Sequence, residues 1–421
     1  MLHALAAVGA LNERRDVYLQ DVTYTRSIVI DHPLESNEPF LCQQEQHNDP
    51  FALAQYNKAI SHLATAIKSS SSNAIDTALL VCVLFVCVEC LRGDYVPALK
   101  HFRGGLSIAI AAAGKGGPNS RASQVTAIRE RLMPFFNRLE LLCQLYGQRP
   151  EYDYGLEPSE ALPDAFHSIV EARDSIVHLM NISIRLIHST KFRRYSNEVT
   201  LADIQELNEV VSGLSTWKEM LDRFVATAPP SSHLTEAATI LQIQRIATLT
   251  WLNRALVPEE TAADADIPMY ELAVRLAESL QFQDHGQTSK SKSKSKSNLP
   301  PSTFFFDMEI VSPIYLVAIK CRHPNIRRRA IAILRHTVRR EGLWDSVKAA
   351  AIAERVMQIE ERDLPTLDGS VLPEEGARVH DCHIDSGPGL NPSGHHVTFF
   401  TMPEGVWGVW RTWDEWVELQ R

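Results

Sequence analysis

The densest group of chemically competent side chains lies near the C-terminus, in two short segments predicted to pair as a β-hairpin. In an extended strand, alternate residues face opposite sides, so His380 and Cys382 share one face and Asp381 and His383 the other. Imidazole, thiolate and carboxylate groups all bind metals where they converge, but this spacing matches no known metal site. We interpret the group as the polar positions of a solvated hairpin, with a metal-dependent enzyme as the alternative. Its members are His380, Asp381, Cys382, His383, Asp385, His395 and His396.

A second group of potential metal ligands is the Cys87-Val-Glu-Cys90 motif, which Cys82 precedes. A zinc site of this type needs a second Cys or His pair at matching spacing, and none stands nearby. The motif overlaps the apolar run 77–88, where thiols pack as small hydrophobic groups. The seven cysteines of the chain are scattered, which is typical of reduced thiols in an intracellular protein. We therefore predict that these cysteines pack in the core.

The segment Gly114-Lys115-Gly116 does not fit a phosphate-binding loop. The earlier glycine of G-x-x-x-x-G-K-[ST] is missing, and Gly116 replaces the hydroxyl residue that would hold magnesium. The sequence also lacks the G-x-S-x-G, H-E-x-x-H and strand-linked G-x-G-x-x-G patterns. We therefore assign no catalytic, cofactor-binding or metal-ligating residue, and we expect no cofactor and no enzymatic activity.

Three consecutive arginines, Arg327, Arg328 and Arg329, form the strongest local concentration of positive charge on a predicted helix. Such a cluster can bind phosphates, but nucleic-acid binding requires concentrated positive charge, and the chain carries a net charge of -9. We therefore interpret the arginines as a solvated helix face that acidic residues of neighbouring helices can pair with.

These arginines belong to Pro313–Asp363, which is predicted to form two consecutive amphipathic helices. Pro324 opens the first, because its fixed φ and missing N–H are tolerated in a first helical turn. Gly342 is predicted at the C-cap of this helix, and Asp345 or Ser346 at the N-cap of the next. The apolar face of the first helix consists of Ile326, Ala330, Ile333, Leu334 and Val338.

The rest of the chain shows the same helical periodicity, so the predicted fold class is all-α: a multi-helix, solenoid-like bundle with a small C-terminal β-hairpin. The longest apolar run, 77–88, is too short to cross a bilayer, which needs roughly 20 residues, so we expect a buried helix and no membrane association. Apolar residues recur every three or four positions in the predicted helices at 2–11, 50–67, 74–91, 95–110, 125–146, 165–190, 201–226, 234–256 and 268–283.

The predicted domain organisation has three parts. Residues 1–284 form the N-terminal part of the helical domain. Residues 285–302 are a disordered Ser/Lys linker, because alternating Lys and Ser cannot bury apolar area. Residues 303–421 form a C-terminal helical part that packs on the same domain.

The predicted hairpin and a tryptophan-rich tail end the chain. Segments 378–385 and 395–401 flank a turn-rich stretch and form the hairpin. Four tryptophans then recur every three residues, which we interpret as a short amphipathic helix that packs on the domain. An aromatic surface that binds a partner is the alternative. The tryptophans are Trp407, Trp410, Trp413 and Trp416.

Several segments together resemble the fungal-specific transcription factor domain that accompanies six-cysteine binuclear zinc clusters. The resemblance is carried by CRHPNIRRRAIAILR, REGLWDS and IEE within 313–363, and by HALAAVGAL at the start of the chain. YNKAISHL at 56–63, ALLVCVLFVCVECLRGDYVPALKHFRGGLSI at 78–108 and RLELLCQLYG at 138–147 extend it. RVHDCHID, VTFFT and the tryptophan-rich tail are similar to the end of that domain. Each segment has low specificity alone, but their order is specific.

The resemblance implies a regulatory domain of a nuclear transcription regulator, with control of a metabolic gene cluster as its setting. The family's zinc cluster, with its Cys-x-x-Cys pairs and basic stretch, has no counterpart here, so no zinc-ligand or base-reading residue is carried over. We therefore do not expect direct DNA binding by this chain. It is either an isolated regulatory domain, or its DNA-binding module is encoded upstream.

The expected partners are proteins of the transcription machinery, a zinc-cluster regulator, or a second copy of the chain. Two other hypotheses stay open at this point. One is a helical protein-interaction scaffold unrelated to transcription. The other is a metal-dependent enzyme that uses the histidines of 380–396.

Overall fold

The computed structural model divides the chain into two compact units, which we describe separately. Unit 1 contains 1–136, 283–306 and 387–390, and unit 2 contains 137–282, 307–386 and 391–421. The predicted linker 285–302 lies outside the described residues, so the domain boundaries drawn around it remain a prediction. The structure describes residues 1–11, 49–68, 74–92, 95–114, 134–135, 137–142, 144–145, 162–280, 303–305, 307–384 and 394–419.

Unit 1 is built on a helix at 2–11 and three longer helices, α2 (Pro50–Lys68), α3 (Ala74–Arg92) and α4 (Tyr95–Gly114). Strand β1 (Thr303–Phe305) also belongs to it. Asp49 precedes α2 as its N-cap residue, and its carboxylate accepts the N–H of Phe51 at 2.9 Å. The core lies between the first helix, α2 and α3, and consists of Ala4, Ala7, Tyr56, Ala59, Val81, Phe85 and Val88.

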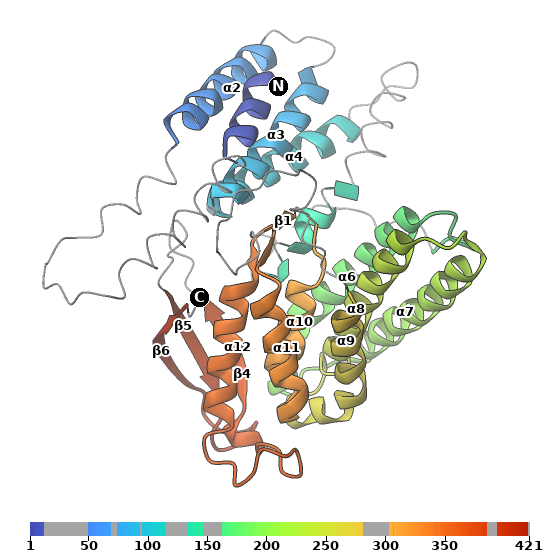
Figure 1. Cartoon of the computed structure of the whole chain (residues 1–421), viewed down its shortest axis with the longest axis vertical. Helices are drawn as coiled ribbons and strands as arrows, with labels where there is room; N and C mark the ends of the chain where they lie inside the picture. Colours follow the sequence, from blue (N-terminus) through green and yellow to red (C-terminus); the bar gives the residue numbers. More distant parts are fainter. Residues whose placement is uncertain are drawn as a thin grey trace, which may run out of the picture. The chain divides into compact units, whose positions relative to one another are not determined.

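In the first half of unit 2, four helices lie at predicted positions and are drawn in green to yellow in Figure 1: α6 (Ile169–Thr190), α7 (Leu201–Thr227), α8 (Ser232–Leu252) and α9 (Ile267–Ser279). Two 3-10 helices connect them, η3 (Arg193–Tyr195) and η4 (Glu260–Asp266). Helix α8 packs against α6, α7 and α9. Local capping fixes where helices begin: Thr200 and Asp203 form a reciprocal capping box at the start of α7.

Helices α10 (Val311–Lys320), α11 (Pro324–His336) and α12 (Ser346–Glu360) pack side by side (Figure 1). Pro324 opens α11 as predicted. Asp345 begins α12, because its carboxylate accepts the N–H groups of Val347 and Lys348 at 3.0 and 3.1 Å.

The prediction that Gly342 forms the C-cap of α11 is wrong. The helix ends at His336, before Val338, and strands β2 (Arg339–Glu341) and β3 (Trp344–Asp345) follow. Glu341 pairs with Trp344, which leaves Gly342 and Leu343 as a two-residue turn. Such turns require positive φ, and Gly342 has φ 54°.

The C-terminal sheet contains β4 (Val379–Ile384), β5 (Gly394–Thr401) and β6 (Arg411–Glu418), in the antiparallel order β4-β5-β6, with the 3-10 helix η5 (Glu375–Ala377) before it. The predicted hairpin is therefore confirmed. The predicted tail helix is wrong, because β6 pairs with β5 along its full length. Tryptophan, threonine and valine favour strands, and Trp413 stacks on Phe399 across the ladder at 5.5 Å.

The fold is mostly α-helical with a small C-terminal sheet, which confirms the predicted fold class. Within the described part of the chain, no helix combines the length and hydropathy that crossing a bilayer requires.

Candidate functional site

A network of buried charges joins the elements of the C-terminal half of unit 2. Glu360, the last residue of α12, accepts hydrogen bonds from Arg322 Nη2 at 2.9 Å and from Arg327. It also accepts the N–H of Val379 in β4 at 2.8 Å. Glu360 and Arg327 are at most 2 % exposed, so the network connects α11, α12 and β4 inside the core.

A second buried carboxylate, Glu260 of η4, completes the network. It accepts hydrogen bonds from Lys320 Nζ at 2.8 Å and from Arg322 Nη2 at 3.0 Å. Burial raises its pKa, but Lys320 and Arg322 outweigh this effect, so the pKa lies below its usual range. The pKa of Glu360 is lowered in the same way, since Arg322 and Arg327 outweigh its burial. These acids are ionised and paired, which is the chemistry of a structural ion network.

The arginine cluster therefore pairs with acidic residues of neighbouring helices, as predicted. Arg328 contacts Glu361, the C-cap residue of α12, at 2.5 Å, and Arg329 contacts Glu271 and Glu278 of α9, both at 2.7 Å. The prediction of a solvated face is wrong for Arg327, because its guanidinium lies inside the core.

A third buried carboxylate, Glu341, fixes the start of α10. Its oxygens accept the backbone N–H groups of Glu309, Ile310 and Val311 at 2.8, 3.1 and 3.0 Å. These N–H groups have no partner within the helix, so a carboxylate there satisfies them and complements the helix dipole. The sequence carries no local signal for this role, because Glu341 lies about 30 residues from the groups it binds.

The histidine cluster of 380–396 is dispersed by the fold. A register shift between Val379 and Asp381 turns His380 into the core, where its Nδ1 lies 3.0 Å from the hydroxyl of Tyr195. Cys382 contacts the Tyr315 hydroxyl at 3.1 Å. Among the residues that the structure describes, no three His, Cys, Asp or Glu side chains converge to hold a metal ion.

The remaining members of the cluster also have separate surroundings. Asp381 pairs with Lys191 at 2.5 Å, and His396 packs edge-on against Trp416. His383 is exposed, and Asp385 lies outside the described residues. The alternative of a metal-dependent enzyme therefore has no assembled site in the described part of the hairpin.

We expect His380 to make unit 2 sensitive to acid. Burial lowers the pKa of His380 to about 4, below its unfolded value of about 6.5. Between these values the unfolded state binds more protons, so stability falls as the pH decreases from 6.5 towards 4. The wild type should lose about 1–2 kcal/mol more than His380→Gln between pH 7 and pH 5. Urea unfolding at both pH values measures this difference, and equal losses would contradict it.

The cysteines of α3 pack as predicted. Cys82, Cys87 and Cys90 are buried. Burial, helped by Cys90, raises the pKa of Cys87 to about 12, so its thiolate is not formed at neutral pH.

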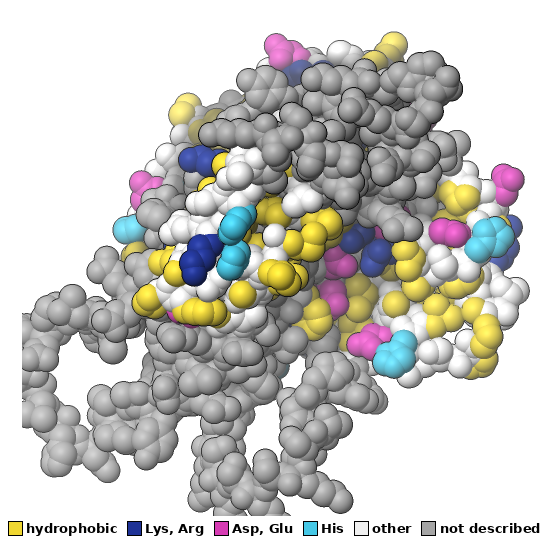
Figure 2. All heavy atoms as spheres, turned by 90° about the horizontal axis from the view of Figure 1, so that it is seen from above, with side chains coloured by type: hydrophobic (Ala, Val, Ile, Leu, Met, Phe, Trp, Pro, Cys, Tyr) yellow, Lys and Arg dark blue, Asp and Glu magenta, His cyan; other side chains and the backbone are white. Residues whose placement is uncertain are grey.

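On the face shown in Figure 2, the described Lys and Arg side chains stand in small separate groups with His, Asp or Glu side chains beside some of them, and they form no continuous basic field on that face. Nucleic-acid binding by phosphate contacts requires such a field.

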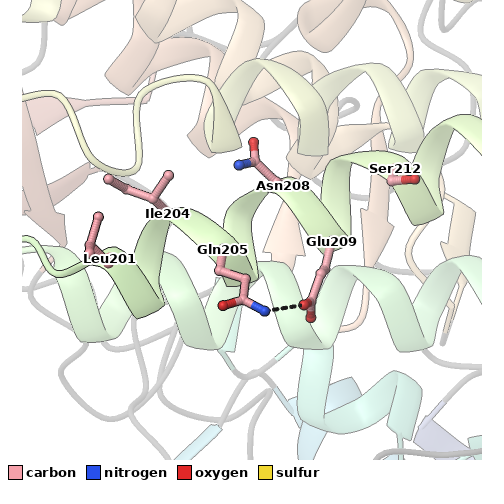
Figure 3. Close-up of a pocket in the computed structure, with 6 residues that line it drawn as sticks. All are labelled: Leu201, Ile204, Gln205, Asn208, Glu209 and Ser212. Carbon is pink, nitrogen blue, oxygen red and sulfur yellow. Dashed lines mark hydrogen bonds between the residues drawn. The ribbon is translucent and has the colours of Figure 1, made fainter.

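Exposed apolar residues occur in both units, and two groups of them lie on unit 2. Trp407, Val409 and Trp416 are exposed around β6, which leaves the partner-binding interpretation of the tail open. A shallow hollow also follows α7 (Figure 3), where Gln205 donates to Glu209 at 3.1 Å. Its labelled residues all come from this one helix, so the hollow has a single wall. They are Leu201, Ile204, Gln205, Asn208, Glu209 and Ser212.

A more enclosed cavity of about 180 Å³ lies within unit 2, between α6, α8 and residues 307–309. Its walls are mainly apolar, and two arginines and two acidic residues stand among them. The lining consists of Arg138, Leu141, Ile169, Val170, Arg173, Val177, Ala237, Ile240, Leu241, Gln244, Asp307, Met308 and Glu309.

The fold and these sites define a helical domain. The buried carboxylates Glu260 and Glu360 pair with basic residues and so connect its helices and strands. Comparison with known families is consistent with that class: the model of the fungal-specific transcription factor domain matches residues 1–356. The chain belongs to this family of transcription-regulatory domains, which confirms the resemblance seen in its sequence.

Two named relatives are similar to this chain. The aspercryptin biosynthesis cluster-specific transcription regulator of Emericella nidulans is 24% identical over 385 residues, covering 74% of this chain. The match spans 63% of the length of that relative. A transcription regulator of Purpureocillium lilacinum is 35% identical over 66 residues, 16% of each chain. No solved structure matches.

Proposed function

We propose that this chain is the regulatory domain of a fungal transcription regulator that controls a metabolic gene cluster. The observation that carries the proposal is the family match over residues 1–356. The Emericella nidulans relative, named as a cluster-specific transcription regulator, supports the cluster-level role. The paired buried charges support a domain that acts by contact, since the described acids and bases of the core stabilise packing.

The finer parts of the proposal concern location, partners and organisation. The chain works in the nucleus, without catalysis of its own, and contacts the transcription machinery, a zinc-cluster regulator or a second copy. Residues 1–284 and 303–421 form one regulatory domain that the segment 285–302 links.

The test is deletion of the gene in its native host, followed by transcript sequencing. We expect transcripts of one contiguous group of biosynthetic genes to change at least several-fold, because regulators of this class act on neighbouring genes together. Reintroducing the intact gene should restore them. A fluorescent fusion should accumulate in the nucleus. Unchanged cluster transcripts, or a fusion excluded from the nucleus, would instead support a scaffold unrelated to transcription.

A further inference from the structure

The cavity between α6 and α8 has the size and walls of a small-molecule site. Leu141, Val177 and Leu241 are at most 6 % exposed and form its deep apolar surface. Val170 and Ala237 stand nearer the solvent. An apolar cavity of about 150 Å³ accepts benzene, so the 180 Å³ here accommodates one ring or a short branched chain.

The two arginines at this cavity, Arg138 and Arg173, differ in how closely they pair with acidic residues. Arg138 Nε donates to Asp307 at 2.8 Å, a good charge-assisted hydrogen bond. Arg173 makes longer contacts, 3.3 Å from Nε to Asp174 and 3.6 Å from Nη1 to Asp307. Its Nη2 donates to no residue in the described part of the chain, and its side chain is 34% exposed. Arg173 therefore retains donors for an anion that enters the cavity.

The acidic groups of the lining oppose an anion only weakly. Asp307 already shares its two oxygens between Arg138 and Arg173. Burial raises the pKa of Glu309 to about 7, although Arg339 opposes this effect. The Glu309 carboxyl group also pairs with the guanidinium of Arg339. Asp174, which lies outside the lining, contacts Arg173 at 3.3 Å and Arg138 at 3.5 Å, so each of these acids is already paired with an arginine.

We propose that this cavity binds a small organic monocarboxylic acid. The carboxylate pairs with the guanidinium of Arg173 at the opening, and the apolar body lies between Val177 of α6 and Leu241 of α8. This binding does not depend on the proposed function. A role as an effector would rest on that function, because the ligand would contact α6, α8 and the segment that leads into α10, and so stabilise their packing.

Benzoate is the probe, and the full-length chain is the target. Saturation-transfer NMR should show benzoate binding in the millimolar range that suits so small a ligand, with a rise in melting temperature. Benzyl alcohol and benzylamine carry the same ring without the negative charge, and each should bind at least tenfold more weakly. The proposal would be overturned if benzoate failed to bind at saturating millimolar concentration. It would also be overturned if either analogue bound as tightly as benzoate or more tightly.

Matched variants test whether benzoate binds in this cavity. Arg173→Gln should weaken benzoate binding at least tenfold, whereas Arg223→Gln on the exposed face of α7 should leave it unchanged. Ala237→Trp should fill the cavity and abolish binding, with Ala202→Trp on α7 as its control. If Ala237→Trp does not fold, Val170→Trp blocks the opening from a half-exposed position. Undiminished binding in a folded blocking variant would exclude this cavity. The outcome of these binding experiments does not change the outcome expected in the transcript test. The ligand site and the proposed regulatory function can therefore be disproved independently.

Discussion

Glu360→Gln should lower the free energy of unfolding of unit 2 by about 3–5 kcal/mol, which is the usual cost of breaking a buried ion pair. The amide keeps the size of the side chain but removes the charge that compensates Arg322 and Arg327. Both guanidinium groups are fully buried, so water cannot replace the carboxylate. The N–H of Val379 loses a charged acceptor at the same time.

Urea unfolding followed by tryptophan fluorescence measures this effect. All seven tryptophans lie in the segments that form unit 2, so the signal reports that unit alone. The matched control is Glu354→Gln on the same helix, whose carboxylate pairs with a partly exposed Arg335. We expect it to cost less than about 1 kcal/mol. A similar small loss for Glu360→Gln would show that the buried network adds little to stability.

Trp217→Ala should cost about 3–5 kcal/mol, the usual range for removing a buried large aromatic side chain. The indole is completely buried between α7 and α6. Its N–H donates to the carbonyl of Ala172 at 2.8 Å, and its ring packs near Phe166. The substitution therefore leaves a cavity and removes a hydrogen bond that links the two helices.

The control for this variant is Trp407→Ala, because Trp407 is 66% exposed. It should change stability by no more than about 0.5 kcal/mol. The same urea titration compares the two variants, since each retains six tryptophans of unit 2 as reporters. Equal effects of the two substitutions would mean that the α6–α7 contact does not depend on the indole.

The helices could be predicted from the sequence because their signals are local. Apolar residues every three or four positions mark one face of a helix, and Asp49, Pro324 and Asp345 act within one turn of the ends they define. The order of these elements also carried the family resemblance, which the match over 1–356 confirmed.

The incorrect predictions for the tail and for Gly342 arose where pairing with distant residues outweighs the local sequence pattern. A tryptophan every three residues fits neither a helical period of 3.6 nor a strand period of 2. Pairing with β5, about 16 residues away, decided that the tail is a strand. Gly342 also has the residue type of a C-cap, but the ladder between Glu341 and Trp344 placed it in a hairpin turn.

The amino-acid sequence alone determined the helical class, most helix boundaries and the family of this protein. Only the tertiary structure decided which charges meet. Arg322 finds Glu260 and Glu360 at separations of 62 and 38 residues, and Glu341 caps a helix that begins 30 residues earlier. The cavity beside Arg173 likewise exists only where α6, α8 and residues 307–309 pack together. Periodicity and capping act over a few residues, whereas ion pairs and cavities form between elements that only the folded chain brings together.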